Sequence, residues 1–135
     1  MKRGFAIALI LAICSAFAGA AATKEEMQAT GEAWLALIDH QQYGESWNQA
    51  SSAFRAQVNA EKWTAAMKAA REPLGEVVSR KLLGVNFAKA LPGAPDGEYA
   101  VLQFHTSFAK KADSTETVTF ALEDGKWKSA GFFIR

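Results

Sequence analysis

The spacing of the apolar residues changes once along this chain of 135 residues, close to Gly75. Before this glycine, apolar residues recur every three or four positions, as they do on one face of an α-helix. After it, they alternate with polar residues, as they do along a half-buried β-strand. A helical half followed by a strand half predicts an α+β domain, in which the helices pack on one face of an antiparallel sheet.

The helical half predicts three helices with recognisable ends. Thr23 is placed to cap the first, with Glu26 three residues later for a reciprocal capping box. Tyr43 is expected to break that helix, and a further turn or two is expected around Phe54. Pro73 ends the last helix, because the residue before a proline is pushed out of helical geometry. The three predicted helices span residues 23–42, 45–50 and 59–71.

The strand half predicts a curved, roughly four-stranded antiparallel sheet. Gly84 is expected to mark a bend or bulge, and residues 109–114 are expected to form a polar loop. Asp124-Gly125 predicts a two-residue type I′ hairpin. The predicted strands span residues 77–91, 99–108, 115–123 and 126–135. The hairpin places Leu122 opposite Trp127, Phe120 opposite Ser129, and Val118 opposite Gly131.

Residues 1–22 have the composition of a cleavable secretory signal peptide. Lys2 and Arg3 are followed by a short apolar run and then by small residues suited to cleavage after Ala20 or Ala22. The run is too short to predict a stable membrane span. A lipoprotein signal is disfavoured, because the bulky Ile13 precedes the only cysteine, Cys14. We therefore expect a periplasmic or secreted protein whose single domain spans residues 23–135.

The charge balance of this domain excludes some classes of partner. Once Lys2 and Arg3 are removed with the signal, 13 basic and 14 acidic residues remain. Such a near-neutral chain offers no electrostatic basis for binding nucleic acid or an anionic membrane. Loss of Cys14 with the signal also leaves no disulfide and no thiol nucleophile. The expected partners are an unknown protein or a small apolar ligand, with the chain a monomer or a homodimer through the sheet.

The sequence nominates no catalytic residue, no metal site and no cofactor. Its two histidines, His40 and His105, lack the spacing of metal ligands. Asp39 is the best candidate for acid–base work, but it cannot pair with His40, because adjacent helix residues point about 100° apart. We expect a specific partner for Asp39, either Arg80 or the indole N–H of Trp47. A structural ion pair or cap is the favoured interpretation.

Aromatic residues are abundant for so small a domain and have two interpretations. They could line a small-molecule pocket, or they could supply the buried area that a small core needs, which we favour. Trp34 and Trp63 are expected to face each other between the helices and the sheet. The candidate pocket or core residues are Trp34, Asp39, Tyr43, Trp47, Trp63, Phe120 and Trp127.

Several segments together resemble the bacterial domain of unknown function 4019. The resemblance is carried by residues 34–39, 43–47, 73–75 with Arg80, 92–99, 116–119 and 125–132. It implies an exported single-domain bacterial protein and carries over no catalytic residue. The order and size of the elements also resemble the nuclear-transport-factor-2-like cone, in which a long N-terminal helix lies across a curved sheet.

Two functions remain open from the sequence. The first is a non-enzymatic exported module that binds a partner or apolar ligand through the sheet or the mouth of the cone. The alternative is a small enzyme in the style of ketosteroid isomerase, with one carboxylate working in an apolar pocket. A raised pKa on the deepest ionisable group would favour the enzyme, whereas an interior filled by Trp and Phe would favour the binding module.

Overall fold

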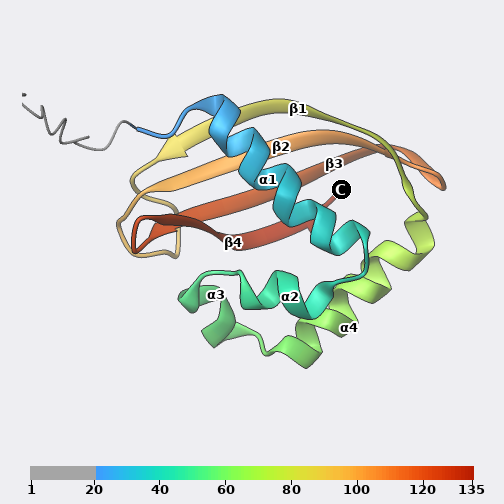
Figure 1. Ribbon diagram of the computed structural model, residues 1–135, viewed down its shortest axis with the longest axis horizontal. Coiled ribbons are helices and arrows are strands. Elements are labelled where there is room, and N and C mark those ends of the chain that lie inside the picture. Colours follow the sequence, from blue (N-terminus) through green and yellow to red (C-terminus); the bar gives the residue numbers. More distant parts are fainter. Residues whose placement is uncertain (1–20) are drawn as a thin grey trace, which may run out of the picture.

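The computed structural model describes residues 21–135, which form an α+β domain with one four-stranded antiparallel sheet (Figure 1). The predicted fold class is therefore confirmed, whereas most of the predicted signal peptide lies outside the described residues. The helices are α1 (Lys24–Asp39), α2 (Tyr43–Asn48), α3 (Ser52–Gln57), α4 (Ala60–Arg71) and the 3₁₀ helix η1 (Glu72–Leu74). The strands are β1 (Val77–Ala88), β2 (Tyr99–Phe108), β3 (Lys111–Glu123) and β4 (Lys126–Ile134).

Two of the predicted helix starts are confirmed. The Thr23 hydroxyl accepts a hydrogen bond from the Glu26 backbone, and the Glu26 carboxylate accepts one from the Thr23 backbone. The Asn59 side chain caps α4. The predicted count of three helices is wrong, because the turn expected around Phe54 is the separate helix α3. Tyr43 does not end the first helix but is the first residue of α2. The helical conformation is interrupted between α1 and α2 at Gln41, whose φ is 62°.

The strands run in the order β1-β2-β3-β4, and α1 lies across them (Figure 1). The bend predicted at Gly84 is confirmed as a shift of register between Leu82 and Gly84. The polar loop predicted at residues 109–114 is wrong, because β3 already begins at Lys111. A tight turn suffices there, since its two backbone N–H groups donate to the carbonyls of Glu76 and Leu74.

The β3–β4 hairpin has the predicted turn but only part of the predicted register. Asp124 and Gly125 both have positive φ, 52° and 76°, as a type I′ turn requires. The pairs Leu122–Trp127 and Phe120–Ser129 are confirmed. The pair Val118–Gly131 is wrong, because Ala130 is an extra residue in β4, so Val118 lies opposite Phe132. This bulge turns the Phe132 ring to within 5.7 Å of the Trp34 ring, centroid to centroid.

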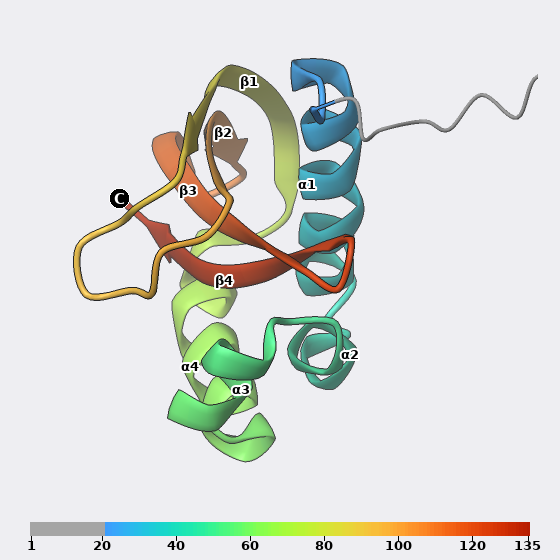
Figure 2. The same cartoon turned by 90° about the vertical axis from the view of Figure 1, so that its left-hand side faces the viewer.

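The sheet curves strongly, with α1 along one side and α2, α3 and α4 below it (Figure 2). Gly31 brings α1 close to β2: a Cβ there would lie 2.6 Å from Leu102 Cδ2. The likeness to the nuclear-transport-factor-2-like cone remains an analogy of element order. The main buried core comprises Met27, Trp34, Leu35, Ile38, Tyr43, Trp63, Met67, Ala100, Leu102, Phe104, Val118 and Phe120.

Candidate functional site

The central tryptophans form part of a packed and hydrogen-bonded core. Trp34 is 4% exposed and Trp63 5%, and their ring centroids are 6.2 Å apart with the ring planes tilted by 36°, so the expected contact between the two residues is confirmed. The Trp34 indole donates to the Ser46 carbonyl at 3.0 Å, and the Trp63 indole donates to Ser46 Oγ at 2.9 Å. Ser46 Oγ in turn donates to the Tyr43 carbonyl. The indole N–H groups of Trp34 and Trp63 and the Ser46 hydroxyl are thus already hydrogen-bonded within the protein.

The other aromatic candidates are dispersed along the same layer. Phe120 is buried and packs edge-on against Trp34. Trp47 is half-buried, and its indole donates to the Val58 carbonyl at 2.7 Å, so Trp47 is not the partner of Asp39. Trp127 lies next to the β3–β4 hairpin, and its ring packs edge-on against Phe87 of β1. Phe120 thus belongs to the core cluster of Trp34 and Trp63, and Trp47 and Trp127 are partly buried side chains packed against that cluster.

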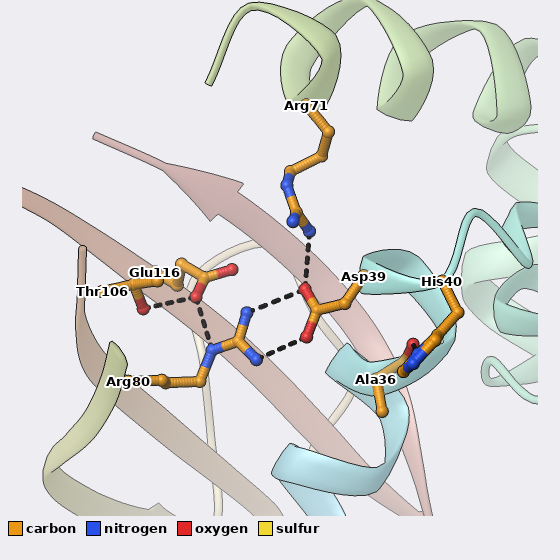
Figure 3. A network of polar contacts seen from close by, with 7 residues as sticks. All are labelled: Ala36, Asp39, His40, Arg71, Arg80, Thr106 and Glu116. Carbon is orange, nitrogen blue, oxygen red and sulfur yellow. Dashed lines mark hydrogen bonds and ion pairs between the residues drawn. The ribbon is translucent and has the colours of Figure 1, made fainter. Parts of the chain in front are cut away.

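A network of charged side chains closes one end of the inner face of the sheet (Figure 3). Asp39, the last residue of α1, accepts two hydrogen bonds from the Arg80 guanidinium, at 2.7 Å and 3.1 Å. Asp39 Oδ1 also accepts from Arg71 Nη1 at 2.8 Å. The predicted partner Arg80 is confirmed. Three elements that are distant in sequence, α1, α4 and β1, are joined through one carboxylate.

Glu116 continues this network into the sheet. Its Oε1 accepts from Arg80 Nε at 2.8 Å and from the Thr106 hydroxyl of β2. Glu116 is fully buried, and Arg71 is nearly so, with its guanidinium 4.8 Å from the centroid of the Phe108 ring. Two arginines and two carboxylates cancel in charge, which is the condition under which charges are tolerated away from water.

The network keeps Asp39 ionised. Burial alone would raise the pKa of its carboxyl, but the hydrogen bonds and charges of Arg80 and then Arg71 outweigh it and lower the pKa below its ordinary value. For Arg80, burial is likewise the largest single effect and opposes charge, yet the two carboxylates together raise its pKa. Asp39 and Arg80 therefore hold each other as an ion pair and do not exchange a proton near neutral pH.

A polar cavity of about 210 Å³ lies beside this network. Its walls include Asp39 and Arg71 together with Tyr43, Glu72 and Glu76. Among the residues that the structure describes, no group of three or more His, Cys, Asp or Glu side chains is placed to hold a metal ion. His40 follows α1 as its C-cap, with its ring nitrogen Nδ1 2.7 Å from the Ala36 carbonyl, and His105 Nε2 lies 3.3 Å from Asp113 Oδ1.

A second and more apolar cleft lies between α3 and the loop of residues 89–98; we call it the α3–loop cleft. Its volume is about 260 Å³. In Figure 2, α3 lies below β4, and the loop lies at the left of the view. The cleft is lined by Ser51, Ala53, Phe54, Gln57, Gly93, Ala94, Pro95, Asp96, Gly97, Glu98, Tyr99, Ala121, Leu122, Glu123 and Ala130.

Hydrogen bonds fix both walls of the α3–loop cleft. The loop is tied by the bond from the Gly97 N–H to the Lys89 carbonyl and by the bond from the Tyr99 hydroxyl to the Pro95 carbonyl. On the other wall, the Ser51 N–H donates to the Ser129 carbonyl at the edge of β4. The cleft is therefore a preformed feature of the fold.

Small side chains on the sheet keep the floor of the cleft open. Ala121 of β3 and Ala130 of β4 supply methyl groups where larger residues would fill the space. Ala130 is also the extra residue of the β4 bulge. Bulges re-aim side chains and often lie next to functional sites.

Residues 30–132, most of the chain, match the family described as protein of unknown function (DUF4019). The chain belongs to the DUF4019 family. The resemblance inferred from the sequence is thereby confirmed. No curated protein matches the chain.

In this DUF4019 protein, sequence reasoning located one half of the charged network and missed the other. Glu116 lies on the same strand face as the apolar Val118 and Phe120. This position in the alternating pattern could have indicated a carboxylate that is buried and paired with a cation. Arg71 at the end of the predicted third helix gave no comparable signal. None of the aromatic candidates lines the α3–loop cleft.

Proposed function

We propose that this DUF4019 domain is an exported, non-enzymatic binding module that takes a small apolar ligand in the α3–loop cleft. The observation that carries the proposal is the contrast between a filled interior and an open cleft. Trp34, Trp63 and Phe120 occupy the inner face. The cleft, in contrast, is open to solvent and is lined by the half-buried Phe54, Ala121 and Ala130 together with Tyr99, which is 8% exposed. A concave, mainly apolar, preformed site with a few polar groups is the usual form of a small-molecule site.

The state of Asp39 favours binding over the enzyme alternative. An enzyme in the style of ketosteroid isomerase needs a carboxylate whose proton affinity is suited to abstracting a proton in an apolar pocket. Here Arg80 and Arg71 occupy both oxygens of Asp39 and lower its pKa. A carboxylate held in this way is a weak base, and its role is to fasten α1 to α4 and β1.

Export is supported by the composition of residues 1–22. Within the part of the chain that the structure describes, no helix is long and apolar enough to cross a membrane. We expect the periplasmic protein to have an intact mass that corresponds to a start near Ala21 or Thr23. A mature species that begins at a lipid-modified Cys14 would contradict this part of the proposal.

The binding role is tested with a neutral aromatic probe, tryptophol, titrated by ligand-observed NMR. We expect saturable binding to the wild type and a loss of about tenfold or more in Ala130→Leu, because the larger side chain occupies the cleft floor. Thr115→Leu is the matched control: it adds a similar side chain to another part of the sheet and should bind as the wild type does. Unchanged binding by Ala130→Leu, or no saturable binding to the wild type, would overturn the proposal.

A further inference from the structure

The charged side chains that line the α3–loop cleft are all acidic. Three carboxylates belong to its walls, those of Asp96, Glu98 and Glu123. Among the described residues, no Lys, Arg or His side chain lines the cleft. The cation nearest to Glu123 is Lys128, whose Nζ lies 3.5 Å from Glu123 Oε1, outside the lining. The space therefore combines an apolar floor with an acidic rim.

Glu123 is held at this rim as a fixed negative charge. Its Oε2 accepts from the backbone N–H of Ser52 at 3.0 Å and from the Ser52 hydroxyl at 2.9 Å. These two bonds lower the pKa of Glu123, so the group is ionised at neutral pH. The Ser52 contacts also join α3 to the end of β3. The Glu123 carboxylate and the Phe54 side chain therefore keep fixed positions relative to each other.

The aromatic wall is suited to the same kind of ligand. The Tyr99 hydroxyl is already engaged with the Pro95 carbonyl, so its ring is fixed in the cleft wall. The Phe54 ring is fixed by an edge-on contact with Trp63, at 5.0 Å between centroids. Aromatic rings attract cations as well as apolar groups. A ligand with an apolar body and one positively charged end would therefore contact apolar and aromatic groups along its body and carboxylates at its charged end.

We infer that the α3–loop cleft, taken as the binding site proposed above, selects small organic amines that carry an aromatic or aliphatic body and a protonated nitrogen. The apolar body lies on Ala121 and Ala130, and the ammonium faces the carboxylates of the rim. The volume of about 260 Å³ suits one ring system with a short amine tail and leaves no room for a folded peptide.

The test compares tryptamine with tryptophol, which share the indole and differ in ammonium against hydroxyl. Chemical-shift titration of ¹⁵N-labelled protein at low salt should give about five- to tenfold tighter binding of tryptamine, the sum of a few exposed charge contacts. The preference should shrink at high salt, because exposed charges are screened. Equal affinities would overturn the amine assignment while leaving the binding site intact. Failure of both probes would overturn the proposed function itself.

Matched charge variants show whether the rim is the cause. Glu98→Gln should reduce the preference for tryptamine over tryptophol by about two- to threefold. Asp113→Asn removes the same charge from an exposed position outside the cleft and should leave both affinities as in the wild type. An equal loss in both variants would mean that net charge, and not the rim, attracts the amine. Tighter binding of Nα-acetyl-lysine amide than of tryptamine would instead assign the cleft to a protein side chain.

Discussion

The inner face of the sheet and the α3–loop cleft are built from opposite kinds of side chain. The inner face gathers the largest residues, among them Trp34, Trp63 and Phe104, and satisfies their polar atoms within the fold. The cleft has alanines on its floor and glycines in a loop that backbone hydrogen bonds hold in place, with Phe54 and Tyr99 beside them. In so small a domain, abundant aromatic residues mark the place that must be filled, and room for a ligand remains where side chains are small.

The two regions also treat charge differently. At the inner face, every charge of the Asp39–Arg80–Glu116–Arg71 network meets an opposite one at hydrogen-bonding distance. At the cleft, three carboxylates line one cavity, and Glu123 is the one that contacts a cation, Lys128, at 3.5 Å. The ion pairs of the first region stabilise the fold. The carboxylates of the second region leave negative charge with which a cationic ligand can pair. Core variants should therefore change stability, whereas cleft variants should change binding.

The largest expected effect is that of Trp34→Ala. It removes a ring that contacts Trp63, Phe120 and Phe132 and leaves the Ser46 carbonyl without its donor. We expect a loss of about 3–5 kcal/mol in the free energy of unfolding, close to the total stability of a domain of this size. Chemical denaturation checks it. A cooperatively folded variant of near-native stability would mean that Trp34 lines open space.

Asp39→Asn should have the next largest effect. The amide keeps the shape of the side chain but leaves Arg71 without its carboxylate partner, and breaking a buried pair from one side costs about 3 kcal/mol. The melting temperature should fall by roughly 10 °C or more. A variant as stable as the wild type, or more so, would indicate a strained, functional carboxylate and would return the enzyme hypothesis to first place.

The difference in stability between the wild type and Asp39→Asn should depend on pH in a predictable way. The folded pKa of Asp39 lies below its ordinary value of 3.8, so its contribution to stability is present above that pH and is lost as the pH falls below it. The difference in unfolding free energy between wild type and Asp39→Asn should therefore be constant near neutral pH and shrink below pH 3.8. Denaturation curves across this range measure it; a difference that grew on acidification would be inconsistent with a lowered pKa.

A matched pair of glycine variants tests how closely α1 packs on the sheet. An alanine Cβ at Gly31 would lie 2.6 Å from Leu102 Cδ2 and 3.3 Å from Phe104 Cζ. We expect Gly31→Ala to lose about 1–3 kcal/mol by overpacking, although alanine favours a helix. At Gly44 in α2 the added Cβ meets no atom within 4 Å, so Gly44→Ala should gain about 0.5 kcal/mol. Stabilisation by both variants would show that α1 is free to move away from β2.

The smallest effect on stability is expected in the cleft. Ala130→Leu adds atoms to open space and should change the free energy of unfolding by no more than about 0.5 kcal/mol. The same variant is expected to lose ligand binding, which makes it the counterpart of Asp39→Asn. Chemical denaturation of Ala130→Leu beside the wild type measures this change in the free energy of unfolding. A loss of several kcal/mol would mean that the alanine is a packed core position.

The sequence predicted what local rules determine. The capping box at Thr23, the cap at Asn59 and the turn at Asp124-Gly125 each depend on residues only a few positions apart. The partnership of Asp39 with Arg80 was also foreseen, because a carboxylate at the edge of an apolar stripe requires a partner. The caps and the turn need no knowledge of how distant segments meet, whereas the choice of Arg80 over the Trp47 indole, the other partner expected for Asp39, does.

The features that were missed depend on contacts between distant segments. The bulge at Ala130 accompanies the bond from the Ser51 N–H to the Ser129 carbonyl, which joins the start of α3 to β4. The early start of β3 at Lys111 depends on carbonyls that precede β1. The α3–loop cleft combines both kinds of contact, and its small residues leave no periodic pattern. Candidate residues chosen for their size therefore pointed to the core.

The central claim is that ligands bind outside the aromatic core, and one titration tests it most directly. Each tryptophan indole N–H gives its own signal in an amide correlation spectrum, so Trp34 and Trp63 report on the inner face while Gly93, Gly97 and Ala121 report on the cleft. On addition of tryptamine, we predict saturable shifts of the cleft signals and unchanged indole signals of Trp34 and Trp63. Saturable shifts of those two indoles with a silent cleft would contradict the account.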